Sequence, residues 1–95
     1  MDQTNQLFWD AAASGDFQKV VATVNQGADV NIRNAEARTA LMRTAKRGHE
    51  KIVRYLLDKG ADVNAKAKNN ATALTLARQE KNKEMISILT NAGAK

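Results

Sequence analysis

The chain has no cysteine and no proline, and its aromatic residues are one tryptophan, one tyrosine and two phenylalanines. Without cysteine, disulfides, thiolate metal sites and a cysteine nucleophile are excluded, which suits a reducing compartment. No apolar run approaches the ~20 residues that span a membrane. The polar stretch Met1 to Gln6 does not resemble a signal peptide. The default expectation is a cytoplasmic protein without a membrane segment.

Sequence motifs of common enzymes are also absent. There is no Gly-x-Gly-x-x-Gly, no phosphate-binding loop and no Gly-x-Ser-x-Gly. The single histidine, His49, cannot by itself form a metal site or a catalytic dyad, and the aspartates recur at positions expected to be turns and helix caps. We therefore expect no enzymatic activity, no cofactor and no metal.

One five-residue stretch recurs at a fixed spacing. Gly60-Ala61-Asp62-Val63-Asn64 has an identical copy 33 residues earlier, at Gly27 to Asn31, and its first two residues return 33 residues later as Gly93-Ala94. A period of this size indicates a solenoid of stacked units. Alignment on the glycines predicts one domain, residues 1–95, made of an N-terminal cap-like unit at 1–33, an internal unit at 34–66 and a C-terminal cap-like unit at 67–95.

Each unit contains the pattern of two short helices. In the middle unit, Thr39 is placed to cap a first helix and Gly48 to end it in a left-handed conformation. Ile52-Val53 and Leu56-Leu57 then give a second helix an apolar stripe at helical spacing. Two short helices leave one apolar face uncovered, so neighbouring units must stack to bury it. Asn31 and Asn64, in the recurring stretch, are expected to stabilise turns.

The middle unit, residues 38–65, resembles an ankyrin repeat, and the resemblance extends over the whole chain as three units. The residues that carry it are the Gly48-His49 pair, the Ile52-Val53-x-x-Leu56-Leu57 run and Gly60 to Asn64. The resemblance implies an all-α solenoid of three helix-turn-helix units joined by β-turn or hairpin-like loops. It also implies a non-catalytic module that binds other proteins.

The chain departs from the family pattern at three places. Thr39-Ala40-Leu41-Met42 replaces Thr-Pro-Leu-His, and Lys81-Asn82 replaces the Gly-His pair in the last unit. The turn glycine two residues before the capping threonine is Ala37 in one unit and Asn70 in the next. Because alanine adopts a left-handed backbone poorly, we expect a distorted turn before Thr39.

The resemblance also implies where a partner binds: on the loop tips and the exposed end of each first helix, which line a concave face. The matching positions expected to contact a partner are Arg33, Glu36, Arg38, Arg43, Lys46, Arg47, Lys66, Lys68, Asn69, Gln79 and Glu80, together with Asn34, Ala35, Ala71, Asp10, Ala13 and Ser14. This set holds seven of the 15 basic residues and three of the 10 acidic ones, so most of the net charge of +5 lies on it. Trp9 is a candidate interface anchor, and we expect it to be exposed or half-exposed, with Phe8 in the core.

These positions favour a monomeric protein-protein interaction module that binds an acidic partner surface, since a concave surface of one charge sign attracts its opposite. Two alternatives stay open. The charges could serve only solubility, or the chain could be a structural or engineered minimal scaffold that has no dedicated partner and self-associates. Nucleic acid is disfavoured as a partner because no aromatic residues for base stacking are interleaved with the basic ones.

Overall fold

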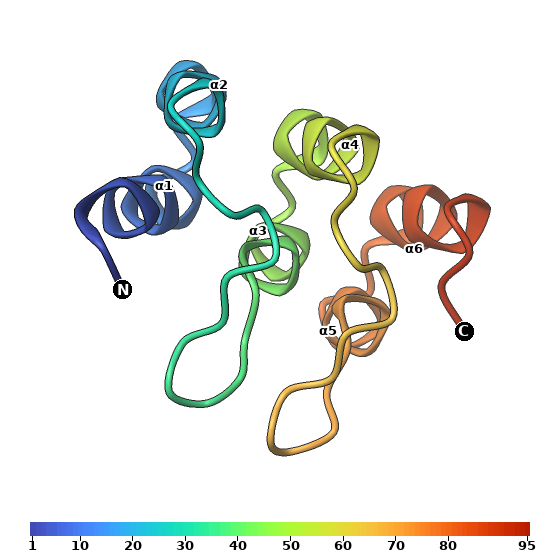
Figure 1. The fold of residues 1–95 in the computed structure, drawn as a ribbon. Helices are drawn as coiled ribbons and strands as arrows, with labels where there is room; N and C mark the ends of the chain where they lie inside the picture. Colours follow the sequence, from blue (N-terminus) through green and yellow to red (C-terminus); the bar gives the residue numbers. More distant parts are fainter.

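The computed structural model describes residues 1–95 and contains six helices and no strands. The helices are α1 (Gln3–Ser14), α2 (Phe17–Asn25), α3 (Ala40–Arg47), α4 (Glu50–Asp58), α5 (Ala73–Gln79) and α6 (Lys83–Asn91). Figure 1 shows two layers, with α1, α3 and α5 side by side in one (the first-helix layer) and α2, α4 and α6 in the other (the second-helix layer). The predicted all-α solenoid is confirmed.

The helix boundaries follow from side-chain capping and from glycine. The Thr39 hydroxyl accepts a hydrogen bond from the Met42 N–H at 3.3 Å, and Thr72 does the same for Thr75 at 3.1 Å. Each bond satisfies one of the amides that the first turn of a helix leaves without a partner. Gly15 and Gly48 end α1 and α3 with φ of 77° and 78°, as the sequence predicts.

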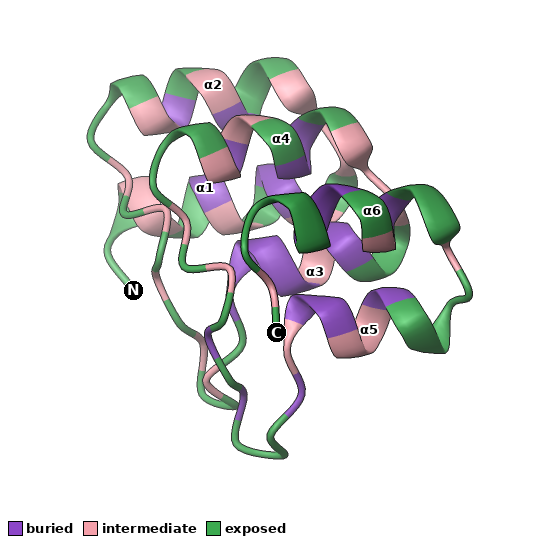
Figure 2. Cartoon of the chain, turned by 90° about the vertical axis from the view of Figure 1, so that its right-hand side faces the viewer, coloured by how far each residue is buried: buried purple, intermediate pink, exposed green.

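A single hydrophobic core runs between the two layers. Its largest fully buried side chains come from every helix except α5, with Phe8 on α1, Leu41 on α3, Leu56 on α4 and Leu89 on α6 among them. Figure 2 shows the buried residues on the sides of the helices where the layers meet. Since fully burying such a side chain contributes about 1.5 to 3 kcal/mol, stacking of the helical pairs is the main source of stability.

The recurring Asp-Val-Asn stretches join consecutive units through hydrogen bonds. The Asn31 side chain accepts from the Asp62 N–H at 2.7 Å and donates to the Gly60 carbonyl at 3.1 Å. Asn64 makes the equivalent pair, accepting from the Lys95 N–H at 3.0 Å and donating to the Gly93 carbonyl at 3.1 Å. The asparagine side chains are therefore structural, but these bonds link consecutive units, whereas the sequence predicted that they stabilise turns.

The prediction of a distorted turn before Thr39 is wrong. Ala37 has a φ of 60° and Asn70, one period later, has a φ of 67°. Their N–H groups donate to Asn34 and Ala67 carbonyls at the same distance of 2.9 Å. The hydrogen bonds and packing of the repeat hold alanine in a left-handed conformation that its Cβ disfavours by about 1 to 2 kcal/mol. The turn is kept, and the strain is local.

Two long loops, residues 32–39 and 65–72, project beyond the first-helix layer on one side (Figure 1). An isolated antiparallel bridge between Arg33 and Thr39 closes the first loop. The backbone N–H of Lys68 in the second loop donates to the Glu36 carbonyl in the first at 3.0 Å. This bond sets the loops beside each other, next to α3 and α5. None of the six helices combines the length and the apolar composition that a membrane crossing requires.

Candidate partner-binding surface

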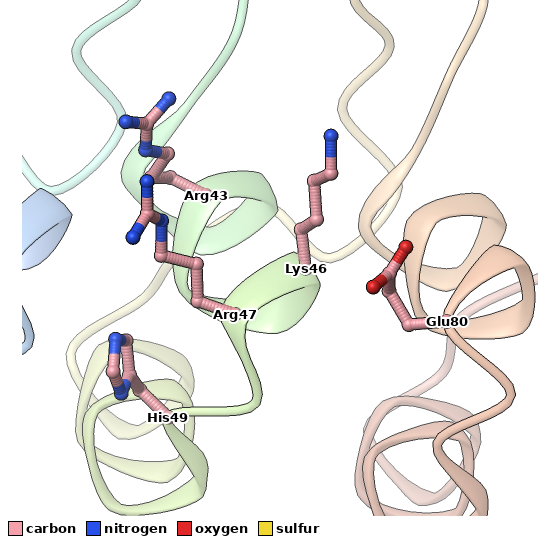
Figure 3. A pocket seen from close by; sticks show the side chains of 5 residues that line it. All are labelled: Arg43, Lys46, Arg47, His49 and Glu80. Atoms are coloured by element: carbon pink, nitrogen blue, oxygen red, sulfur yellow. The ribbon is translucent and has the colours of Figure 1, made fainter.

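Helix α3 carries three cationic residues on its exposed side. Leu41, Met42, Thr44 and Ala45 are buried in the core, which leaves Arg43, Lys46 and Arg47 at helical spacing toward the outside. Lys46 and Arg47 are exposed, whereas Arg43 is half-buried. Figure 3 shows the three side chains projecting from α3 on the side away from α4. The amphipathic pattern of α3 thus fixes the positions of these charges.

These cations line an open depression, here called the basic depression. Its lining consists of Arg43, Lys46, Arg47, His49 and Glu80, and its volume is about 440 Å³. His49 precedes α4 and Glu80 follows α5, so the depression spans the carboxyl-terminal ends of two neighbouring first helices (Figure 3). Three arginine and lysine side chains face a single carboxylate there. The depression can therefore accept anionic groups, which arginine binds through two parallel hydrogen bonds.

A smaller cleft adjoins the basic depression and shares Arg43 and Lys46 with it. It has a volume of about 60 Å³ and is also lined by Trp9, Asn34, Arg38, Met42 and Leu76. Trp9 and Leu76 are half-buried, while Phe8, next to Trp9, is fully buried as the sequence predicts. The Arg43 Nε atom is buried and has no hydrogen-bond partner. Three of the seven residues that line the cleft are hydrophobic, and three others, Arg38, Arg43 and Lys46, are cationic.

Of the eighteen residues predicted to contact a partner, seven line the cleft or the basic depression and eleven line neither. Those that line one of the two hollows are Trp9, Asn34, Arg38, Arg43, Lys46, Arg47 and Glu80. Those that line neither are Asp10, Ala13, Ser14, Arg33, Ala35, Glu36, Lys66, Lys68, Asn69, Ala71 and Gln79.

Several of the outlying residues have structural contacts in the loops. The Arg33 guanidinium donates to the Lys66 carbonyl at 2.9 Å, and the Asn69 side chain accepts from the Ala71 N–H at 3.1 Å. Gln79 is exposed on α5. Arg33 and Asn69 thus help to shape the loops.

Sequence reasoning missed two members of the cleft, Met42 and Leu76. Leu76 stands 33 residues after Arg43, so the period that relates Gln79 and Glu80 to Lys46 and Arg47 also points to it. The sequence pattern places Met42 at the helix entry and gives no sign of its place in the cleft. His49, for which the sequence suggests no site, lines the basic depression, and its ring lies so close to Gly15 that a Cβ there would be 2.6 Å from His49 Cε1.

The fold and the site together define a helical repeat protein whose exposed basic residues include a group on α3 and on the loops 32–39 and 65–72. A family model for ankyrin repeats matches residues 8–95 in three copies. The chain belongs to the ankyrin repeat family, which confirms the resemblance seen in its sequence and indicates a protein-protein interaction module.

A similar protein is a probable E3 ubiquitin-protein ligase, XBOS33, of Oryza sativa subsp. japonica. It is 45% identical over 47 residues, which is 50% of this chain and 9% of the ligase. The chain therefore spans a small part of that protein's length, and the alignment gives no ground for assigning ligase activity to it.

Proposed function

We propose that the chain is a non-catalytic, monomeric binding module that takes an acidic protein surface on its basic face, defined as loops 32–39 and 65–72 with the exposed sides of α3 and α5. The observation that carries this proposal is the basic depression, where Arg43, Lys46 and Arg47 surround one open hollow with only Glu80 in opposition. A hollow of one charge sign focuses the potential and speeds the encounter with an oppositely charged partner.

Arginine gives this surface geometric selectivity as well as attraction. Its planar guanidinium presents donors that match the two oxygens of a carboxylate. Arg38 lies in the adjoining cleft and Arg47 at the far end of α3, so the two mark opposite ends of the cationic region. Neither side chain is fully buried, so both can reorient to reach a partner.

The test is charge reversal on this face with a matched control elsewhere. Immobilised wild-type chain, Arg38→Glu/Arg47→Glu and Arg54→Glu/Lys83→Glu would be exposed to extract from the native cell across a salt series, and bound proteins identified. Arg54 and Lys83 are exposed on α4 and α6. The control variant therefore has the same net charge as the first variant, but its substitutions lie on the second-helix layer. We expect acidic proteins to bind wild type and control but not the first variant, and to elute as salt rises.

Circular dichroism would verify that both variants keep the helical signal of wild type. Equal capture by all three proteins would show that the basic face is not the binding site. The scaffold alternative gives a different result: sedimentation of the isolated chain would show self-association at low salt without any added partner, which our proposal does not allow.

A further inference from the structure

The cleft beside the basic depression differs from a purely electrostatic surface. Its lining includes Trp9, Met42 and Leu76, which contribute an indole, a thioether and an aliphatic side chain. Partly exposed tryptophan is enriched among residues that dominate binding energy, especially in pockets that a partner dehydrates. Carboxylates alone would leave this apolar lining uncovered, so the cleft calls for an apolar group on the partner.

The size of the cleft limits that group. A site that holds one water-sized group needs about 10 to 15 Å³ on the same measure. At about 60 Å³, the cleft accommodates about four to six such groups. This is the size of a branched aliphatic side chain such as leucine, and it is too small for an indole.

Arg43 links the two hollows and has a hydrogen-bond donor that no other protein group uses. Its Nε atom is buried without a hydrogen-bond partner, although nearly all buried polar groups in proteins have one. The same side chain lines both the cleft and the basic depression. The side chain as a whole is only half-buried, so the guanidinium can turn to present Nε to an oxygen of a bound segment while a neighbouring side chain of that segment fills the cleft.

The spacing along α3 sets the register of such a segment. Arg43 and Arg47 are one helical turn apart, which is about 6 Å along the axis, and an extended chain covers that distance in about two residues. The cleft lies toward loop 32–39, and the basic depression extends to the carboxyl-terminal end of α3. A segment lying along α3 would place its aliphatic residue in the cleft and its acidic residue about two positions away.

We infer that the partner contributes an extended acidic segment, with one leucine-sized aliphatic side chain seated among Trp9, Met42 and Leu76 and a carboxylate about two residues away on Arg43 and Arg47. The inference rests on the proposed function and specifies the chemistry of its partner. Charge complementarity selects the acidic residues, and the apolar cleft selects the anchor.

Selection of random dodecapeptides on the immobilised chain tests the inference without knowledge of the natural partner. We expect the enriched peptides to share an aliphatic residue with aspartate or glutamate about two positions away. A synthetic, tryptophan-free peptide of this type should change the emission of Trp9 on titration. The chain has one tryptophan, so the signal comes from the cleft.

Substitutions in the peptide and in the protein test where the aliphatic side chain binds and whether Arg43 Nε donates a hydrogen bond. Changing the peptide's aliphatic residue to alanine, or Leu76→Ser in the protein, should weaken binding at least about tenfold. Leu7→Ser is the matched control, since Leu7 is 49% exposed on α1 and lies outside the cleft. Arg43→Lys keeps the charge but removes Nε, and it should weaken binding about tenfold. Arg54→Lys is the matched control, because Arg54 is exposed on α4 and lines neither hollow, and it should leave binding unchanged.

The outcomes separate the inference from the proposed function. Enriched peptides that are acidic, lack an aliphatic residue and bind Leu76→Ser as tightly as wild type would overturn the aliphatic anchor and leave the acidic-partner proposal standing. Peptides without acidic residues would overturn both. Failure to enrich any peptide would overturn the inference, because a single short segment would then not be the binding unit. If Leu76→Ser lost its helical signal, the peptide-side alanine substitution on the unchanged protein would decide.

Discussion

Ala37→Gly should stabilise the fold, although it removes a side chain. Ala37 has a φ of 60°, in the left-handed region that costs an L-residue about 1 to 2 kcal/mol. Glycine removes this cost, but it makes the unfolded chain more flexible, which offsets about 0.4 to 1 kcal/mol of the gain. The net gain in the free energy of unfolding is about 0.5 to 1 kcal/mol. For a domain of this size, that corresponds to a rise in melting temperature of about 2 to 8 °C.

The measurement is urea and thermal unfolding followed by far-ultraviolet circular dichroism. Ala35→Gly is the matched control, because Ala35 lies in the same turn and is not among the residues with positive φ. It should destabilise the chain by about 0.4 to 1 kcal/mol, since only the entropic cost remains. A lower melting temperature for Ala37→Gly than for wild type would refute the claim that this turn stores backbone strain.

Three further substitutions test the backbone geometry and packing of the helix ends, each by urea denaturation. Lys81 follows α5 and has a φ of 56°, so Lys81→Gly should raise the free energy of unfolding by about 0.5 to 1 kcal/mol. A lower free energy of unfolding would mean that the contacts of the lysine side chain outweigh the backbone strain. Gly15→Ala should cost about 2 to 4 kcal/mol because its Cβ would meet the His49 ring, whereas Gly27→Ala has open space and should cost less. In a His49→Ala background the cost of Gly15→Ala should fall by about 1 kcal/mol or more, and strict additivity would argue against the contact. Thr39→Ala should lose about 1 kcal/mol with its cap, and an unchanged midpoint would show that the cap contributes nothing.

The helical repeat was predictable because period, caps and stripes all point to the same structure. Thr39, Gly15 and Gly48 cap their helices as their residue types suggest. The Ala37 turn was not predictable from local preference, since alanine argues against a left-handed backbone there. Hydrogen bonds within each loop explain the turn: the bond from the Asn34 N–H to the Arg38 carbonyl recurs one period later between Ala67 and Ala71, and this closed loop holds a left-handed residue whether it is alanine or asparagine.

The candidate surface was predictable in its charges and not in its shape. The resemblance to ankyrin repeats placed Arg43, Lys46 and Arg47 on the exposed side of the first helix, and the structure gathers them around one depression. The cleft depends on Trp9 of α1 and Leu76 of α5 lining one space together with residues of α3. That arrangement is set by the packing of three helices from different units, which no single motif records.

An NMR map of the chain with a captured acidic protein or a selected acidic peptide would show directly whether the basic face is the binding surface. We expect the largest shifts on Arg38, Arg43, Lys46 and Arg47 and on the Trp9 indole, and we expect them to fade as salt is added. Shifts confined to α2, α4 and α6, with the residues of the basic face unmoved, would place the partner on the second-helix layer and refute the proposal.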